Sequence, residues 1–351
     1  MNQLKTIIAS LSGLTCLFLF PFTAVAETPS TPNSDPWLTY AGGEGPGKGK
    51  HVVLISADQE YRSEQSLPMM AKILAKHHGF DCTVLFGVNE EGLVDPTMPV
   101  HPKKGEEDAF KLHNIPGLEK LQKADALIFL TRLLTLPDEQ LQHFADYFDS
   151  GKPIIALRTS NHGFRSTLPY IIDGEQVTIK DILGGAFMNH HGVWHQDSTR
   201  GDIVPEMKGH PVLTGVKDIW GPSDVYRTYE EGTGLPEGCT ALVYGQPLIG
   251  REYGGEDNPE KIPLPVVWFK DWTTSEGKKA RVLHSTMGSG KDLQSAGLRR
   301  LVINGVYWGI GMEDKISPDS SVDFVGEYQP LVSGFAYEKL GVKPRPISDY
   351  R

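Results

Sequence analysis

Short apolar runs alternate with amphipathic segments along the first half of the chain. Four runs are apolar at almost every position, as expected for strands buried on both faces: residues 50–58, 81–88, 124–130 and 152–159. Two segments have apolar residues at helical spacing and are stopped by a glycine: residues 64–80 and 137–151. This alternation predicts an α/β fold with a parallel central sheet covered by helices on both faces.

The second half continues with strand-like segments and a closing helix. The apolar pattern predicts strands at 202–206, 239–246, 263–272 and 279–288, and a helix at 296–311.

No linker-like segment interrupts residues 49–312, and we therefore predict one large domain over this range. Residues 27–48 are rich in proline, glycine and polar residues and predict a flexible linker. Residues 89–114 are polar, so we expect them to form a surface excursion, a segment that extends from the fold and adds nothing to the core. Residues 313–351 predict a tail extended along the surface.

The N-terminus has the pattern of an export signal. Lys5 precedes an apolar stretch, and residues 24–26 read Ala-Val-Ala, a site typical of signal peptidase. We therefore expect residues 1–26 to be removed from an exported protein, periplasmic or extracellular. An uncleaved anchor is the alternative, but Pro21 and the short apolar run disfavour it. No other segment is apolar enough to span a bilayer, so no membrane association is expected after cleavage.

Charge and cysteine content narrow the class of protein. The formal net charge is −10 at pH 7, so the chain lacks the basic surface that nucleic acid demands, and no nucleic-acid partner is expected. Cys16 belongs to the predicted signal, while Cys82 and Cys239 remain. They could form one disulfide in an oxidising compartment or stay as two buried thiols. Neither has a CxxC partner, so a cysteine metal site is not predicted.

Polar side chains follow the predicted strands at the points where the strands end. The carboxyl ends of parallel strands meet at one edge of a sheet, and ligands of α/β proteins bind there. We therefore predict a substrate-binding group that consists of Tyr61, Arg62, Arg132, Arg158, Asn161 and His162.

The polar turn after the fourth apolar run leaves three alternatives. A nucleophile elbow of the form G-x-S-x-G is absent, because Ser160 is flanked by Thr159 and Asn161. Ser160 could still be a nucleophile with His162 as its base. Ser160 and Asn161 could instead satisfy backbone groups of the loop. In the third alternative, Arg158, Asn161 and His162 bind substrate.

Residues 184–197, GGAFMNHHGVWHQD, gather His190, His191 and His195. Histidine is both a common metal ligand and the usual acid–base residue near neutral pH. In an extended chain His190 and His191 point to opposite sides, so at most one faces a given site. We predict His191 as the acid–base residue, with His190 as its competitor. All three histidines are candidate ligands of a divalent metal, although their spacing is not H-E-x-x-H. One core histidine and two exposed ones are the alternative.

A later segment, residues 210–230, contributes Asp224 and Tyr226. Asp224 is a candidate catalytic carboxylate that orients a group or accepts a proton, and Tyr226 is a candidate substrate contact. Four tryptophans are candidates for stacking on a sugar and equally for the core: Trp194, Trp220, Trp268 and Trp272.

The order and spacing of these segments resemble the ThuA-like (trehalose utilisation) family, a branch of the class I glutamine amidotransferase-like fold, over roughly residues 49–312. The resemblance implies a flavodoxin-like three-layer sandwich, a role in the metabolism of trehalose or keto sugars, and a divalent metal such as zinc as a candidate cofactor at the histidine turn. Active glutamine amidotransferases carry a cysteine at the elbow. Here the matching position is about Arg158, so glutaminase activity is not expected.

Three functional hypotheses follow. The first is an exported enzyme that acts on a carbohydrate or other small-molecule ligand, as a hydrolase, lyase or isomerase, with His191 and Asp224 at its centre. The second is a carbohydrate-binding or scaffold protein without catalysis. The third is a serine hydrolase that uses Ser160. The oligomeric state stays open.

Overall fold

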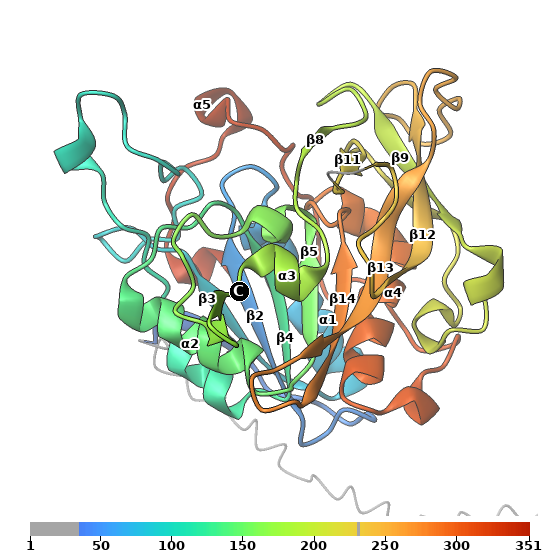
Figure 1. Ribbon diagram of the computed structural model, residues 1–351, viewed down its shortest axis with the longest axis horizontal. Helices are drawn as coiled ribbons and strands as arrows, with labels where there is room; N and C mark the ends of the chain where they lie inside the picture. Colours follow the sequence, from blue (N-terminus) through green and yellow to red (C-terminus); the bar gives the residue numbers. More distant parts are fainter. Residues whose placement is uncertain (1–34, 230–231) are drawn as a thin grey trace, which may run out of the picture. The chain divides into compact units, whose positions relative to one another are not determined.

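A ten-stranded mixed sheet forms the centre of the protein (Figure 1). The computed structural model describes residues 35–229 and 232–351, so the predicted signal and residues 27–34 of the predicted linker lie outside it. The sheet has the order β1-β3-β2-β4-β5-β14-β13-β12-β9-β10. Its parallel strands are β2 (His51–Ala57), β3 (Asp81–Phe86), β4 (Ala126–Thr131), β5 (Ile154–Leu157) and β14 (Lys279–Ser285). Taken in chain order these strands lie 2-1-3-4-5, the order described for flavodoxin-like sheets.

The remaining strands of the sheet are antiparallel to their neighbours: β1 (Trp37–Tyr40), β9 (Ser198–Ile203), β10 (Ile219–Gly221), β12 (Cys239–Leu248) and β13 (Leu264–Thr273). The predicted parallel sheet is thus confirmed for the centre only. The reason lies in the connections, because residues 274–278 between β13 and β14 form a short turn, and a short turn can join only antiparallel strands.

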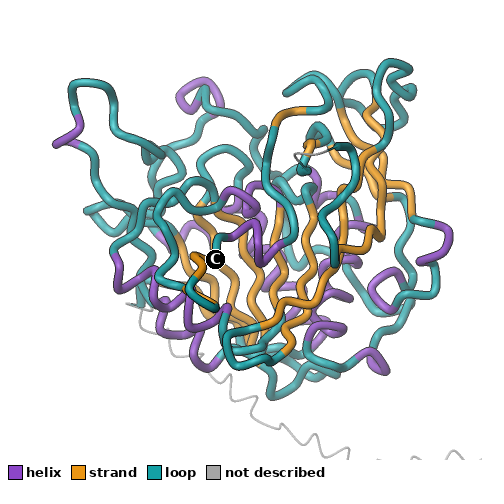
Figure 2. The backbone as a smooth tube through the Cα atoms, viewed as in Figure 1, coloured by secondary structure: helices purple, strands orange, loops and turns teal. Residues whose placement is uncertain are grey.

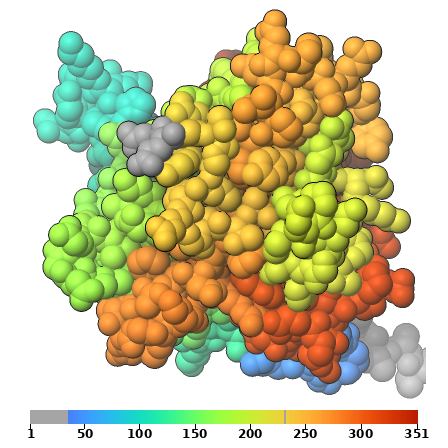
Figure 3. Space-filling model, turned by 45° about the vertical axis from the view of Figure 1, so that its right-hand side comes forward, coloured from blue at the N-terminus to red at the C-terminus, as the bar shows by residue number. Residues whose placement is uncertain are grey.

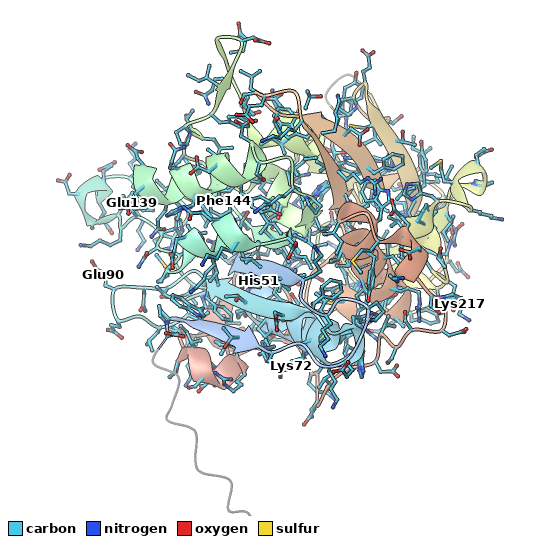
Figure 4. The ribbon with its side chains drawn as sticks, turned by 90° about the horizontal axis from the view of Figure 1, so that it is seen from below. His51, Lys72, Glu90, Glu139, Phe144 and Lys217 are labelled. Atoms are coloured by element: carbon cyan, nitrogen blue, oxygen red, sulfur yellow. The ribbon has the colours of Figure 1, made fainter. Side chains whose placement is uncertain are left out.

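Helices cover both faces of the sheet. Their bounds are α1 Ser63–His78, α2 Asp138–Phe148, α3 Ile179–Leu183 and α4 Ala296–Gly309. Val52 and Leu54 of β2 pack in one core with α1 and α4, whereas Val53 and Ile55 pack in a second core with α2 and α3. Figure 4 shows Phe144 of α2 and Lys72 of α1 on opposite sides of the strands. The period-two alternation of a strand buried on both faces produces this division.

The two predicted helices of the first half are confirmed. α1 ends at Gly79, whose φ of +80° is left-handed and whose N–H reaches the carbonyls of Leu74 and Ala75. α2 begins directly after Pro137, as proline allows at a helix start.

The part of the predicted linker that the structure describes is not a linker. Leu38 is buried, and β1 pairs antiparallel with β3 at the edge of the sheet. Gly43 and Gly47 then donate backbone hydrogen bonds to Ala75 and His78 at 3.0 and 2.7 Å. Residues 36–48 are therefore held by strand pairing with β3 and by hydrogen bonds to the end of α1. Local composition does not reveal these contacts.

The predicted tail also makes specific contacts. Leu331 N–H donates to Gln65 Oε1 at 2.8 Å, and Arg345 N–H donates to the Val94 carbonyl at 3.0 Å. This segment contains the 3-10 helices η7 (Glu313–Lys315) and η8 (Ile347–Tyr350) and the short helix α5 (Tyr337–Leu340).

Small elements complete the fold. They are η1 (Glu107–Ala109), η2 (Leu118–Lys123), η3 (Arg158–His162), η4 (Pro205–Met207), η5 (Pro211–Leu213), η6 (Asp292–Gln294), β6 (Ile171–Ile172), β7 (Glu175–Gln176), β8 (Asn189–His190) and β11 (Tyr226–Arg227). Loops gather above the ends of the parallel strands (Figure 2). Part of the predicted excursion at 89–114 stands out from the surface in teal (Figure 3), whereas Val94 and His113 within it are buried. Cys82 and Cys239 are free thiols. Among the residues that the structure describes, no helix has the length and apolar character needed to cross a bilayer.

Candidate functional site

Arg158 occupies the turn at which β5 ends and η3 begins. Its backbone has φ +44°, a left-handed conformation that is uncommon for a residue with a side chain. A nucleophile elbow also places its reactive residue on a strained strand-to-helix turn. Here that position carries a fully buried guanidinium instead.

Hydrogen bonds on two nitrogens fix this guanidinium. Nη1 donates to the backbone carbonyls of Asp224 at 2.7 Å and Thr286 at 2.8 Å, and Nη2 donates to the Tyr61 hydroxyl at 3.1 Å and to Asp224 Oδ1 at 3.0 Å. The guanidinium carbon also lies 4.5 Å from the ring centroid of Tyr61 and 3.7 Å from that of Tyr226. Paired and stacked in this way, Arg158 remains charged in the interior.

Asp224 also contacts a histidine, through Oδ2, the carboxylate oxygen that Arg158 does not contact. Asp224 Oδ2 and His190 Nδ1 are 2.7 Å apart, and the Asp224 side chain is 2% exposed against 34% for His190. Burial raises the pKa of Asp224, but the Arg158 charge and the His190 hydrogen bond outweigh burial and hold the pKa below its ordinary value. The ionised carboxylate accepts from Nδ1–H, which leaves Nε2 as the proton-accepting atom of His190.

The pairing of β8 decides which histidine joins Asp224. β8 runs antiparallel to β11, with His190 opposite Tyr226. Side chains alternate along a strand, so His190 faces Asp224 and His191 turns away, with its Nε2 2.8 Å from the Ile262 carbonyl. The prediction that His191 accompanies Asp224 is corrected here, because His190 holds that place.

A second buried carboxylate, Glu60, follows β2. Trp194 Nε1 donates to Glu60 Oε1 at 2.9 Å, and Arg132 Nε lies 3.5 Å from Oε2. His195 Nε2 lies 3.4 Å from Oε1, within ion-pair range, although it is not aligned as a hydrogen bond. Burial raises the pKa of Glu60, but His195, Arg132 and Trp194 together lower it below its ordinary value.

The Trp194 indole lies against both carboxylate–histidine pairs. Its ring centroid is 5.9 Å from that of His190 and 4.1 Å from that of His195. Phe335, from the C-terminal segment, lies 6.3 Å from the indole, with the Arg132 guanidinium 4.9 Å from its ring centroid. Trp194 is 41% exposed and Phe335 is 40% exposed. The site therefore offers aromatic surface to solvent beside its two carboxylate–histidine pairs.

Asp58 connects the turn after β2 to the turn after β5. Its Oδ1 accepts hydrogen bonds from the backbone N–H of Glu60 at 2.7 Å and from that of Tyr61, and its Oδ2 accepts from the Thr159 hydroxyl at 2.5 Å. Burial raises the pKa of Asp58. These bonds fix the position of Glu60 relative to the Arg158 turn.

Most of the predicted substrate-binding residues form the interior of the site. Arg62, with φ +61°, is fully buried and donates to the carbonyls of Gln59 at 2.9 Å and Gly334 at 3.1 Å. Four others are also buried: Tyr61, Arg158, Asn161 and Tyr226. Arg132 and His162 keep some exposed surface. Tyr61 bonds both Arg158 and Tyr226, so these three buried residues have partners within the protein. Direct ligand contact by the buried residues stays a prediction.

Ser160 and His162 do not form a nucleophile–base pair. Ser160 Oγ donates to the Phe129 carbonyl at 3.0 Å and accepts from Thr131 N–H at 3.2 Å. His162 Nδ1 lies 2.7 Å from Asn161 Oδ1. Burial and the nearby charges of Arg132 and Arg158 lower the pKa of His162 to about 3. Ser160 thus has the backbone-satisfying role, and His162 is neutral.

The three predicted metal ligands do not converge. His190 bonds Asp224, His191 bonds the Ile262 carbonyl, and His195 lies beside Glu60. Within residues 35–229 and 232–351, no group of three or more His, Cys, Asp or Glu side chains is arranged to hold a metal ion.

Sequence reasoning missed two parts of the site. Glu60 was one of several polar residues after the first strand, and nothing in its local sequence distinguished it. Phe335 lies in the predicted surface tail, and the contacts of Gly334 with Glu60 and Arg62 help to bring it to the site.

Comparisons with known proteins give distant similarity only. No protein-family model matches the chain, and no curated protein matches it. Among solved structures, a protein described as ThuA-like from Parabacteroides merdae is 12% identical with a TM-score of 0.47, and the match covers 87% of this chain and 99% of the other. The N-terminal domain of mmIFT52 is 13% identical with a TM-score of 0.38, covering 73% of this chain and 96% of the other. At these values the similarity carries no conclusion about function.

Proposed function

We propose that this chain is an exported ThuA-like protein of carbohydrate metabolism, on a flavodoxin-like three-layer scaffold, whose acid–base pair is His190 and Asp224. The observation that carries the proposal is the 2.7 Å contact between Asp224 Oδ2 and His190 Nδ1. A buried carboxylate behind a partly exposed imidazole sets the tautomer and steadies the imidazolium that forms when Nε2 takes a proton.

Arg158 supports this role without touching the ligand. It holds Asp224 through both its backbone carbonyl and its carboxylate. The positive charge keeps Asp224 ionised at neutral pH, so His190 keeps its orientation. Backbone strain at Arg158 is the kind of feature that clusters at functional sites.

Two observations favour a carbohydrate as the ligand. Trp194 and Phe335 expose aromatic surface next to His190, and an aromatic face packs well on the C–H face of a sugar ring. The sequence resemblance to the ThuA-like family points the same way. The site also lies where the parallel strands end, the usual ligand edge of such sheets.

The matched variants His190→Gln and His191→Gln test the proposal. Both remove one imidazole from adjacent positions, but only His190 faces Asp224. On a panel of glycosides and free sugars, we expect His190→Gln to reduce turnover by about 10²- to 10⁴-fold, as for loss of a general acid–base group. His191→Gln should retain turnover, and both should keep the melting temperature. Equal activity of His190→Gln and the parent chain on a confirmed substrate would refute the assignment.

A non-catalytic carbohydrate-binding protein is the second candidate. It is favoured by one observation, the presence of Arg158 where an elbow would carry its nucleophile. Calorimetry combined with product analysis distinguishes the two: saturable sugar binding with no product formed supports the binding role. Export is tested separately by the mature N-terminus, which we expect at Glu27.

A further inference from the structure

Arg132 differs from the other arginines of the site in having unoccupied donors. Arg62 and Arg158 are fully buried, and each donates four hydrogen bonds. The Arg132 side chain is 17% exposed, and within residues 35–229 and 232–351 its guanidinium donates no hydrogen bond and makes one ion-pair contact, from Nε to Glu60 Oε2 at 3.5 Å. Neither Nη1 nor Nη2 is sealed from solvent. Both nitrogens are therefore available to a ligand.

Aromatic rings connect Arg132 to the proposed acid–base residue. The Arg132 guanidinium lies 4.9 Å from the ring centroid of Phe335, which lies 6.3 Å from that of Trp194. The Trp194 ring lies in turn 5.9 Å from that of His190. Trp194 and Phe335 are 41% and 40% exposed, so a cation, aromatic surface and an imidazole follow one another on the same part of the protein.

A second series of contacts leads from His190 back to Arg132. The ring centroid of Phe187 is 5.1 Å from that of His190 and 4.9 Å from that of His162. Leu133, the residue after Arg132, donates its N–H to the His162 carbonyl at 3.0 Å. The two series together border one area of the surface, with Arg132 and His190 both on its edge.

We propose that the sugar of this site is a uronic acid, free or as a glycoside, whose carboxylate binds Nη1 and Nη2 of Arg132 while its ring packs against Trp194. This inference rests on the proposed function, because it names the class of sugar for the same site. Arg132 is then the residue that determines specificity, and His190 keeps its acid–base role.

Glu60 fixes Arg132 and Trp194 relative to each other. One of its carboxylate oxygens accepts the Trp194 Nε1–H at 2.9 Å, and the other lies 3.5 Å from Arg132 Nε. Phe335 also lies under the guanidinium, so the arginine is restrained at Nε and on one face while its two terminal nitrogens stay open. A ligand that uses both the cation and the indole meets a surface whose parts are already positioned, which reduces the entropy cost of binding.

The charge at this position suits a carboxylate better than a phosphate. A guanidinium presents two parallel N–H groups that match the two oxygens of a carboxylate. A phosphate monoester carries about −1.5 to −2 charges at pH 7. Arg132 offers one positive charge, the donors of Arg62 and Arg158 are occupied by protein groups, and the Glu60 carboxylate lies close by. A second negative charge on the ligand would therefore lack a partner.

Calorimetric titration of the full chain with matched sugars tests the inference. The ligands are D-glucuronate and D-galacturonate, and the controls are D-glucuronamide and D-galacturonamide, in which a neutral amide replaces the carboxylate. We expect each acid to bind about 10- to 100-fold more tightly than its amide, as for a hydrogen bond to a charged group. Arg132→Met should bind acid and amide equally. Arg132→Lys keeps the charge without the fork and should retain part of the preference.

The control variant is Arg165→Met, because Arg165 is exposed and lies outside the two series of contacts. It should keep the preference of the parent chain for the acids. Glucose-6-phosphate is the control for charge and should bind less tightly than D-glucuronate. Melting temperatures equal to that of the parent chain would show that the variants fold.

The outcomes separate this inference from the proposed function. Equal affinity of the parent chain for acids and amides, no binding of either acid, or undiminished binding of the acids by Arg132→Met would overturn the uronic acid. The His190 assignment would stand in each case, because the glycoside panel measures turnover of neutral sugars. Tighter binding of glucose-6-phosphate than of D-glucuronate would overturn the carboxylate as the recognised group.

Discussion

The Arg158 guanidinium holds Asp224 at two points, the backbone carbonyl at 2.7 Å and carboxylate Oδ1 at 3.0 Å. The strained turn after β5 and the segment that carries Asp224 are therefore joined through these two hydrogen bonds. Because both side chains are buried, neither charge can be solvated if the other is removed, and the stability of the fold and the geometry of the site depend on the same pair.

Replacement of Arg158 by an uncharged residue should destabilise the fold. We expect Arg158→Met to lower the free energy of unfolding by about 3–5 kcal/mol, because it leaves the buried Asp224 carboxylate without its arginine and with only the His190 contact. The measurement is urea unfolding. Arg200→Met is the matched control: Arg200 pairs with Asp202 and Asp257 on the surface, and an exposed pair contributes about 0–1 kcal/mol.

A double-mutant cycle with Asp224→Asn sharpens the test. The double variant should lose less stability than the two single variants together, because no unpaired charge remains. Additive losses would mean that Arg158 and Asp224 do not stabilise each other.

Glu64 gives the fold an unusual pH dependence. It is buried at the start of α1 with Arg62 Nη1 4.0 Å away, and burial raises its pKa to about 7 against the partial opposition of Arg62. The folded chain therefore binds the proton more tightly than the unfolded chain does. Below the ordinary glutamate pKa, Glu64 does not reduce the free energy of unfolding. The reduction grows as pH rises through about 4.3 and is complete above about 7.

Glu64→Gln should remove this dependence. Its stability relative to the parent chain is expected to increase by about 3 kcal/mol between pH 4 and pH 8. Unfolding free energies of both chains across that range provide the measurement. A constant difference between the two chains would show that Glu64 titrates normally in the folded state.

Local pattern predicted the central strands and the main helices because burial leaves a strong periodic signal there. β2 and α1 are examples, the first apolar throughout and the second closed by Gly79. β1 was read as linker because its four residues have proline- and glycine-rich flanks. β1 forms because it pairs with β3, which lies about 45 residues further along the chain. Local composition carries no information about such a distant contact.

The candidate site was predicted by the rule that ligands bind at strand ends, but the contacts among its residues were not predicted. Whether His190 or His191 faces Asp224 depends on the register of β8 with β11, and a shift of one residue would exchange them. Arg158 was predicted to contact the ligand because it follows a strand at the edge of the sheet where ligands bind. Its burial depends on Tyr61 and Tyr226, which arrive from distant elements.

Chelation should leave the folded protein unchanged. His190 bonds Asp224, His191 bonds the Ile262 carbonyl and His195 lies beside Glu60, and among the described residues no three metal-ligating side chains are arranged to hold an ion. We expect EDTA to shift neither the melting temperature nor the activity. Stoichiometric zinc in the purified chain that His190→Gln abolishes would contradict this and would restore the predicted metal site.

Gly334 should be intolerant of any side chain. Its φ of +136° is accessible essentially to glycine alone, and a Cβ there would lie 2.9 Å from His195 Cε1. We expect Gly334→Ala to destabilise the fold and to displace the His195 ring, which would shift its NMR resonances. Gly341→Ala is the matched control, because Gly341 has φ +70° and no atom within 4 Å of an added Cβ. It should cost about 1–2 kcal/mol from backbone strain alone and leave His195 unchanged. If both variants leave the His195 resonances in place, the C-terminal segment does not position that histidine.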